Sequence, residues 1–121
     1  MIKPIMKSEF FLRLPSEDAG PDDAATGQDL LDTLHEHKRE CVGLAANMIG
    51  VRKRIICVKD GNRTLLMYNP QILEQVNAYQ TSEGCLSLTG ERPCTRYRRI
   101  KVEYLDENFV HRIKNFSGYT A

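Results

Sequence analysis

The chain has 121 residues, of which 41% are hydrophobic and 27% charged, and its 17 Lys and Arg against 16 Asp and Glu leave a formal net charge of +1. This length predicts one domain with its own core, and the balanced charge excludes a general attraction to nucleic acid or acidic membranes. No apolar run approaches the roughly 18 residues of a membrane span. Residues 1–7 do not form the apolar block of a signal peptide, so we expect a cytoplasmic protein.

Prolines and the spacing of apolar residues predict the elements at the beginning of the chain. Residues 1–23 contain three prolines and are expected to form an irregular N-terminal arm. Apolar residues then recur at helical spacing, and Thr26 followed by Asp29 resembles a capping box, which together predict a helix over 26–40. Residues 54–115 are expected to be mostly strands.

Short β-prone runs occupy this second part of the chain. Residues 55–58 and 65–68 flank an Asp-Gly-Asn turn and predict a hairpin, whose second strand we expect to end at Asn69-Pro70. A less regular strand candidate follows at 72–79. The fold class predicted from these elements is α+β.

A second hairpin is predicted near the end. Charged and apolar residues alternate over 99–104, which is typical of a strand with one solvent-facing side, and a turn at 106–108 leads into a strand at 109–114. Ser117 is placed as a possible N-cap of a further helix.

Two segments look like loops that expose their backbone. Gly43 and Gly50 flank a run of small residues, so this backbone could pair with an extended peptide; the alternative is a helix C-cap at Gly43 and a turn at Gly50. In the second segment, 82–87, Cys85 could be a thiolate metal ligand or a nucleophile, and the alternative is a buried structural cysteine.

The other thiols and the histidines indicate no metal site. The four cysteines, at 41, 57, 85 and 94, include no C-x-x-C pair, so we expect reduced thiols. His35 and His37 lie about 200° apart around the expected helix and cannot both face one ion. His111 lies in an expected strand.

The two exposed segments together resemble a known family. Gly43-Leu44-Ala45-Ala46 followed by Glu83-Gly84-Cys85-Leu86-Ser87 is similar to the first and second signature motifs of the peptide deformylases. Residues 96–102 and 116–121 are similar to the family's strand after the cysteine loop and to the lead-in to its catalytic helix. The resemblance implies mainly antiparallel sheets packed around helices, with a central C-terminal helix that these 121 residues do not include.

The resemblance also implies an activity and the residues that carry it. The family removes the formyl group from the N-terminal formylmethionine of nascent polypeptides, with a divalent metal such as iron, nickel or zinc. It implies that Cys85 is a metal ligand and that the Leu86 amide is an oxyanion donor. The implied substrate-binding residues are Gly43, Leu44, Ala45, Glu83, Gly84 and Arg96.

The first motif departs from the family's usual G-x-G-L-A-A-x-Q at two positions. Cys41 stands at the first glycine, and Met48 stands at the glutamine that completes the oxyanion site. Methionine has no donor, and the loss of one such contact costs about 2.7 to 4 kcal/mol of transition-state stabilisation. Asn47 is a neighbouring donor that could compensate. A short branch of deformylase-like proteins is similar in carrying Ala-Ala-Asn-Met-Ile-Gly, so this departure alone does not imply inactivity.

The second departure is that the sequence stops at Ala121, before the H-E-x-x-H helix with two metal ligands and the general base. We therefore expect a C-terminally truncated domain that is inactive as written and does not retain its metal. Its apolar groove is expected to be covered by another copy, a peptide or a swapped segment. The expected partners are formylated N-terminal peptides, including ribosome-associated nascent chains.

Two other functions remain open. One is a non-catalytic module, or pseudoenzyme, that binds N-terminal peptides without cleaving them. The other is a thiol-dependent enzyme with Cys85 as its nucleophile.

Overall fold

The computed structural model describes residues 1–39, 41–84, 87 and 90–121. In these residues, five strands form one antiparallel sheet in the order β1-β2-β3-β4-β5, and the expected α+β class is confirmed. The elements are α1 (Glu9–Leu12), η1 (Pro21–Asp23), α2 (Ala24–Glu36), β1 (Gly43–Ala45), η2 (Ala46–Ile49), β2 (Ile55–Asp60), β3 (Arg63–Gly84), β4 (Glu91–Leu105) and β5 (His111–Ser117). No helix in this part of the chain has the length and apolar character of a membrane span.

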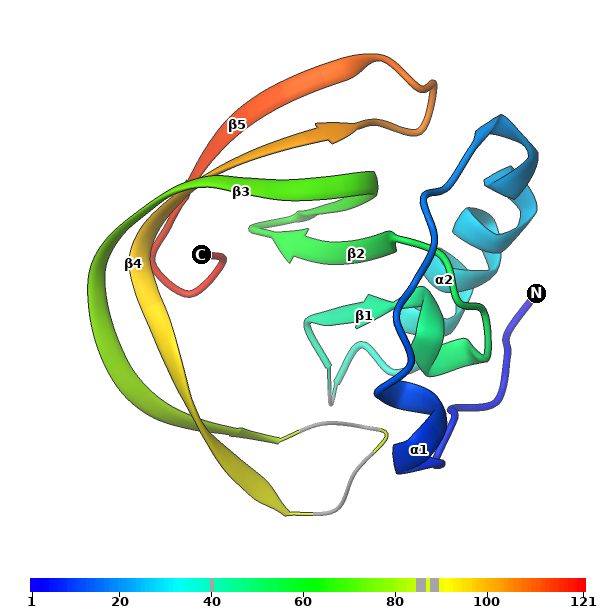
Figure 1. The fold of residues 1–121 in the computed structure, drawn as a ribbon, viewed down its shortest axis with the longest axis horizontal. Helices are drawn as coiled ribbons and strands as arrows, with labels where there is room; N and C mark the ends of the chain where they lie inside the picture. Colours follow the sequence, from blue (N-terminus) through cyan, green and yellow to red (C-terminus); the bar gives the residue numbers. More distant parts are fainter. Residues whose placement is uncertain (40, 85–86, 88–89) are drawn as a thin grey trace.

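The sheet is strongly curved, and its two longest strands extend beyond the others. In Figure 1, β3 and β4 continue as a strongly curved two-stranded ribbon, while α2 and the N-terminal segment lie beside β1 and β2. The chain's last residues turn back into the curve. This curvature places the far end of the ribbon opposite β1.

Two apolar clusters lie on opposite faces of the sheet, because neighbouring residues of a strand point to opposite sides. The larger cluster packs beneath α2 and is made of Ala19, Leu30, Leu34, Leu44, Ala46, Ile49, Ile55, Cys57, Leu66 and Tyr68. The smaller one faces the inside of the curve and is made of Met67, Val102, Tyr104 and Phe116.

Helix α2 differs at both ends from the expected 26–40. It begins at Ala24 because the 3-10 turn Pro21–Asp23 leads into it, with the Gly20 N–H donating to Asp23 Oδ2 at 2.9 Å. It ends at Glu36 because His37 and Lys38 offer no apolar side chain to the core beyond Leu34. Thr26 is therefore inside the helix and is not its cap.

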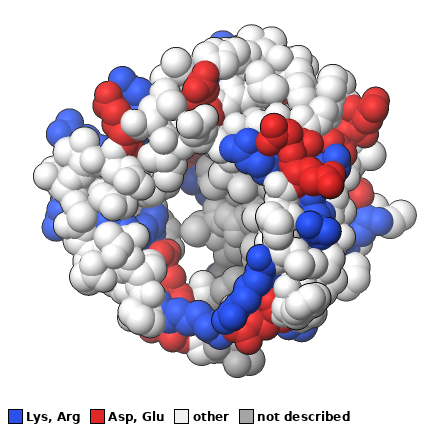
Figure 2. All heavy atoms as spheres, in the orientation of Figure 1, with Lys and Arg blue, Asp and Glu red and all other residues white. Residues whose placement is uncertain are grey.

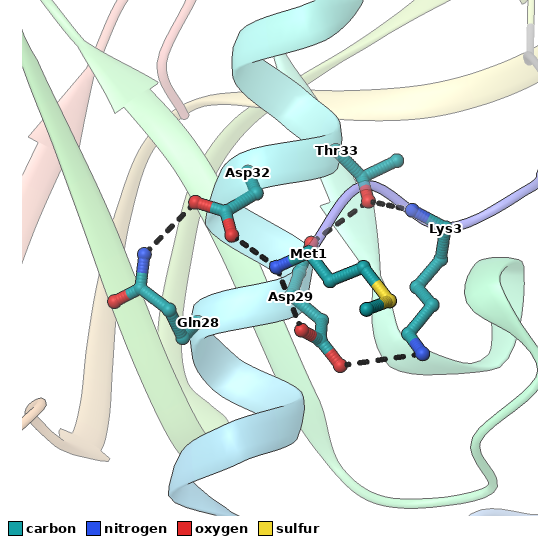
Figure 3. Close-up of polar contacts among 6 residues, drawn as sticks. All are labelled: Met1, Lys3, Gln28, Asp29, Asp32 and Thr33. Carbon is teal, nitrogen blue, oxygen red and sulfur yellow. Dashed lines mark hydrogen bonds and ion pairs between the residues drawn. The ribbon is translucent and has the colours of Figure 1, made fainter.

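Asp29 binds the N-terminal segment instead of capping the helix (Figure 3). The Met1 ammonium group donates to Asp29 Oδ1 at 3.0 Å and also to Asp32. Further along, the Lys3 N–H donates to Thr33 Oγ1 at 2.9 Å. The first residues of the expected irregular arm thus run along α2, and the arm also contains α1.

The expectation that Asn69-Pro70 ends a strand is wrong, because β3 passes through these residues to Gly84. Asn69 has a positive φ of 53°, and the pairing with β4 shifts register on both sides of Ile72. The Asn69 side chain accepts from the Ala19 N–H at 2.7 Å and donates to the Ala19 carbonyl at 2.9 Å. Since a register shift leaves a position without a ladder hydrogen bond, the strand accommodates proline by bending.

The alternation expected over 99–104 is present, with Val102 and Tyr104 buried. The next strand, however, covers His111–Ser117 and not 109–114. Phe109 has a positive φ of 58°, and Asp106 Oδ1 accepts from the Val110 N–H at 3.0 Å, so the turn extends through Val110.

Candidate functional site

A cavity of about 700 Å³ lies between β1 and the far end of the β3–β4 ribbon. Figure 2 shows this face hollowed near its centre, with acidic and basic side chains interspersed around the opening. The described residues that line the cavity are Cys41, Val42, Gly43, Met48, Tyr79, Thr81, Ser82, Glu83, Gly84, Glu91, Arg96 and Tyr119. We call this cavity the cleft.

The cleft brings together residues from both sequence motifs. Gly43 and Met48 come from the first motif, whereas Glu83 and Gly84 come from the second and Arg96 comes from β4. Leu44 and Ala45 are part of β1, but Leu44 is buried in the larger apolar cluster and neither residue lines the cleft.

One edge of β1 is unpaired by any described strand and faces the cleft. The Lys59 N–H donates to the Val42 carbonyl at 2.8 Å, and Gly43 pairs in register with Val58. Because hydrogen-bonded and non-hydrogen-bonded pairs alternate in an antiparallel ladder, the backbone groups of Gly43 and Ala45 point away from β2. A side chain at Gly43 would come within 3.2 Å of the Cys57 carbonyl, so the close strand pairing favours glycine there.

Two sulfur atoms contact this edge. The Cys41 thiol donates to the Gly43 carbonyl at 2.8 Å, and the Ala45 N–H donates to Met48 Sδ at 3.4 Å. Asn47, which was expected to be able to replace the missing glutamine, instead donates its side-chain amide to the Leu12 carbonyl at 3.2 Å. Its donor therefore faces α1 and the N-terminal segment.

The opposite wall of the cleft carries a group of interacting polar side chains. Arg96 lies 3.2 Å from the Glu83 carboxylate and donates to the Tyr119 carbonyl at 2.7 Å. The Cys94 thiol donates to Glu83 at 2.8 Å, and this hydrogen bond raises the pKa of Cys94. A guanidinium carries five N–H donors, so Arg96 has donors to offer to a peptide carbonyl as well.

The residues that the resemblance places closest to the metal are not in the described part of the chain. Cys85, the expected metal ligand, and Leu86, the expected oxyanion donor, both lie outside the described residues. Ser87 is described: it is 3% exposed, and its hydroxyl has no hydrogen-bond partner among the described residues.

The described residues do not by themselves fit a metal. Within residues 1–39, 41–84, 87 and 90–121, no group of three or more His, Cys, Asp and Glu side chains is arranged to hold an ion. His35 is exposed on α2, and His111 is exposed on β5, where it contacts Glu103. Cys57 is buried in the core, and burial raises the pKa of its thiol to about 12.

Several residues that line the cleft were not predicted from the sequence. Tyr79 and Thr81 line the cleft together with Glu83, and this spacing of two residues is the signal that could have found them. Tyr119 gave no such signal, because only the turn after β5 brings it to Arg96.

Comparisons with known proteins identify the family. The family model of polypeptide deformylases matches residues 6–121. A peptide deformylase of Clostridium beijerinckii is 50% identical over all 121 residues, which cover 89% of that protein. This chain belongs to the peptide deformylase family. The resemblance noted from the two motifs is thereby confirmed, and the family is a metal-dependent one.

Solved peptide deformylases also share the fold. A class I type b peptide deformylase from Acinetobacter baumannii, solved with Met-Ala-Ser bound, has a TM-score of 0.88 and 26% identity, and the match covers 100% of this chain and 88% of that one. The peptide deformylase of Thermus thermophilus has a TM-score of 0.88 and 31% identity, with coverage of 100% and 75%. The expected deformylase-like fold is confirmed.

A second, apolar cavity of about 330 Å³ lies on the inside of the curved sheet. It is lined by Ile56, Val58, Met67, Pro70, Gln71, Ile72, Ile100, Val102, Phe116, Thr120 and Ala121. Its mostly apolar lining makes this cavity a candidate for the groove expected from the sequence. What covers the groove stays a prediction.

Proposed function

We propose that the cleft binds the N-terminal residues of formylated nascent polypeptides in an extended conformation, and that the protein serves in the hydrolytic removal of their formyl group. The observation that carries this proposal is the β1 edge, where Gly43 lines a cleft of about 700 Å³ and the backbone groups of Gly43 and Ala45 point away from β2. The family membership and the Met-Ala-Ser complex of the Acinetobacter baumannii relative support it.

Binding through the β1 edge suits substrates whose amino-acid sequences differ, as those of nascent polypeptides do. An extended peptide that adds to a sheet edge gains its affinity from main-chain hydrogen bonds, which every sequence can make. Arg96 lies on the facing wall with its charge balanced by Glu83, so it can donate to a carbonyl without attracting anions indiscriminately. The cleft volume is within the usual range of about 300 to 1,000 Å³ for ligand sites.

The finer assignments are part of the same proposal. Cys85 would be a metal ligand, with iron, nickel or zinc as candidates, and the Leu86 amide would be an oxyanion donor. Met48 would stand where the family has its glutamine. A cytoplasmic location, where nascent chains leave the ribosome, would bring the protein to its substrates.

Formate release tests the hydrolytic part. The isolated polypeptide of residues 1–121 would be assayed anaerobically with formyl-Met-Ala-Ser and excess iron, nickel or zinc, with Cys85→Ala as the control. Formate that depends on Cys85 would assign hydrolysis to these residues and contradict the expectation of inactivity. Peptide binding without formate would support the alternative of a non-catalytic N-terminal-peptide-binding module.

Peptide binding is tested separately by calorimetric titration with Met-Ala-Ser. The matched control is the same peptide with its Ala nitrogen methylated, which removes one backbone donor and leaves every side chain intact. Pairing with the β1 edge predicts weaker binding of the methylated peptide by roughly tenfold, the loss expected for one unmade hydrogen bond. Equal binding of both peptides would overturn the edge-pairing mode.

The covering of the apolar groove needs its own measurement. Sedimentation of the isolated polypeptide at micromolar concentration tests the prediction that a second copy or a swapped segment fills it. A monodisperse monomer would contradict that prediction.

A further inference from the structure

Two of the outward-facing backbone groups of the β1 edge are already in contact with sulfur atoms of the chain itself. The Gly43 carbonyl accepts from the Cys41 thiol at 2.8 Å, and the Ala45 N–H donates to Met48 Sδ at 3.4 Å. Cys41 and Met48 both line the cleft. One acceptor and one donor of the edge are therefore satisfied before any peptide arrives.

A purely local role would account for only part of this arrangement. Met48 is the third residue of η2, so its sulfur on the Ala45 N–H also acts as a cap for that short helix. Cys41, however, lies outside η2 and contacts a different backbone group of the same edge, the Gly43 carbonyl. Two sulfur atoms from separate positions in the chain thus contact one edge.

Sulfur is suited to a temporary contact. A thiol is a weak donor and a thioether is a weak acceptor, so both satisfy a backbone group less strongly than a peptide N–H or C=O does. Both contacts join residues two or three positions apart in the sequence, so releasing them requires local side-chain rotation and leaves the β1–β2 ladder in place. An incoming backbone can therefore replace them.

We propose that Cys41 and Met48 form a displaceable cap on the β1 edge, which an entering peptide exchanges for its own backbone N–H and C=O groups. This inference rests on the proposed peptide-binding function of the cleft. It makes the two side chains determinants of peptide affinity, because the apparent dissociation constant rises as the fraction of uncapped protein falls. It also makes the cap a device that keeps an exposed strand edge from pairing with other chains.

Variants that remove one sulfur contact at a time test the cap. Cys41→Ala removes the donor to Gly43, and Met48→Leu removes the acceptor for Ala45 at nearly constant volume. Each is expected to tighten the binding of Met-Ala-Ser by roughly two- to tenfold, the range of one modest hydrogen bond. Cys41→Ser keeps a stronger donor and is expected to weaken binding. The matched control, Met67→Leu, makes the same exchange in the smaller apolar cluster and is expected to leave affinity unchanged.

Hydrogen exchange of the peptide-free protein separates the cap from the proposed function. Met48→Leu is expected to speed exchange of the Ala45 amide and leave that of Leu44, which faces β2, unchanged. Unchanged or weaker peptide binding in Cys41→Ala and Met48→Leu would overturn the cap, since a merely structural role cannot tighten binding. Absence of binding in every variant, despite faster Ala45 exchange in Met48→Leu, would overturn the proposed peptide-binding function and the displacement with it.

Discussion

Arg96 of β4 and Glu83 of β3 form an ion pair on one wall of the cleft, with the guanidinium 3.2 Å from the carboxylate. The same guanidinium donates to the Tyr119 carbonyl at 2.7 Å and lies 5.3 Å from the centre of the Tyr119 ring. The Arg96 side chain is only 16% exposed, so water screens these contacts incompletely. Arg96 therefore joins the turn after β5 to the ribbon that forms the cleft.

Replacing Arg96 is expected to destabilise the fold. Arg96→Ala removes the contacts with both Glu83 and Tyr119, and the free energy of unfolding should fall by about 1 to 2 kcal/mol, as measured by urea denaturation followed by circular dichroism. Arg96→Lys keeps the charge but loses the planar guanidinium group. Its free energy of unfolding should lie between those of the wild type and Arg96→Ala. The control is Arg99→Ala on the exposed side of β4, which should change stability by less than about 0.5 kcal/mol. Equal effects at both positions would contradict a special role for Arg96.

Gly27→Ala in α2 is expected to destabilise the protein, although alanine is the better helix former. A Cβ at Gly27 would lie 2.2 Å from the hydroxyl oxygen of Tyr68, and Tyr68 is 1% exposed and cannot move aside freely. Because this contact is far shorter than van der Waals distance, the overpacking should cost close to the upper end of the usual range of about 1 to 3 kcal/mol, which exceeds the roughly 1 kcal/mol gained in helix propensity. Thermal denaturation would show this loss of stability as a lower midpoint temperature. Gly20→Ala, where nothing lies within 4 Å, is the control and should have little effect; a stabilised Gly27→Ala protein would refute the packing argument.

Two substitutions at Asn69 separate its backbone role from its side-chain role. Asn69→Gly keeps the positive φ accessible but loses both hydrogen bonds to Ala19, and it should lower the free energy of unfolding by about 1 to 3 kcal/mol. Asn69→Ala loses the same bonds and adds the strain of a positive φ, so it should cost about 1 kcal/mol more. Urea denaturation of the two variants gives the difference. If alanine were tolerated as well as glycine, the backbone at Asn69 would not be strained.

Acidification is expected to remove the stabilising contribution of Asp106. Hydrogen bonds from Arg112 and from the Val110 and Asn108 N–H groups hold the pKa of Asp106 below its ordinary value. Because the folded state binds this proton less readily than the unfolded state, the contribution is present above the unfolded pKa of about 3.9 and is lost as pH falls through the folded pKa.

The difference in urea midpoint between the wild type and Asp106→Asn should therefore be larger at pH 7 than at pH 3. The neighbouring exposed Glu107 provides the control substitution, Glu107→Gln, for which only a small difference is expected at either pH. A wild-type advantage over Asp106→Asn that grew on acidification would contradict the direction of the shift.

The fold was predictable where its determinants are local. The apolar spacing at Leu30, Leu31 and Leu34 predicted a helix, and the alternation around Val102 predicted a strand that is part of β4. The helix ends were not predicted, because the turn at Pro21 starts the helix earlier than the residue that looked like a cap. The continuation of β3 through Asn69 was not predicted either, because its bend is stabilised by Ala19, fifty residues away in sequence.

By itself, the sequence determined the family and the chemical character of the two motifs, because short motifs carry backbone and side-chain requirements that hold within a few residues. Only the tertiary structure decided that Gly43 and Glu83 line one cleft and that Arg96 reaches Tyr119. It also decided that the sulfur atoms of Cys41 and Met48 lie on the edge of β1 that a peptide would use. These relationships depend on the curvature of the β3–β4 ribbon and on which side of β1 faces β2, and both are set by packing between strands distant in sequence.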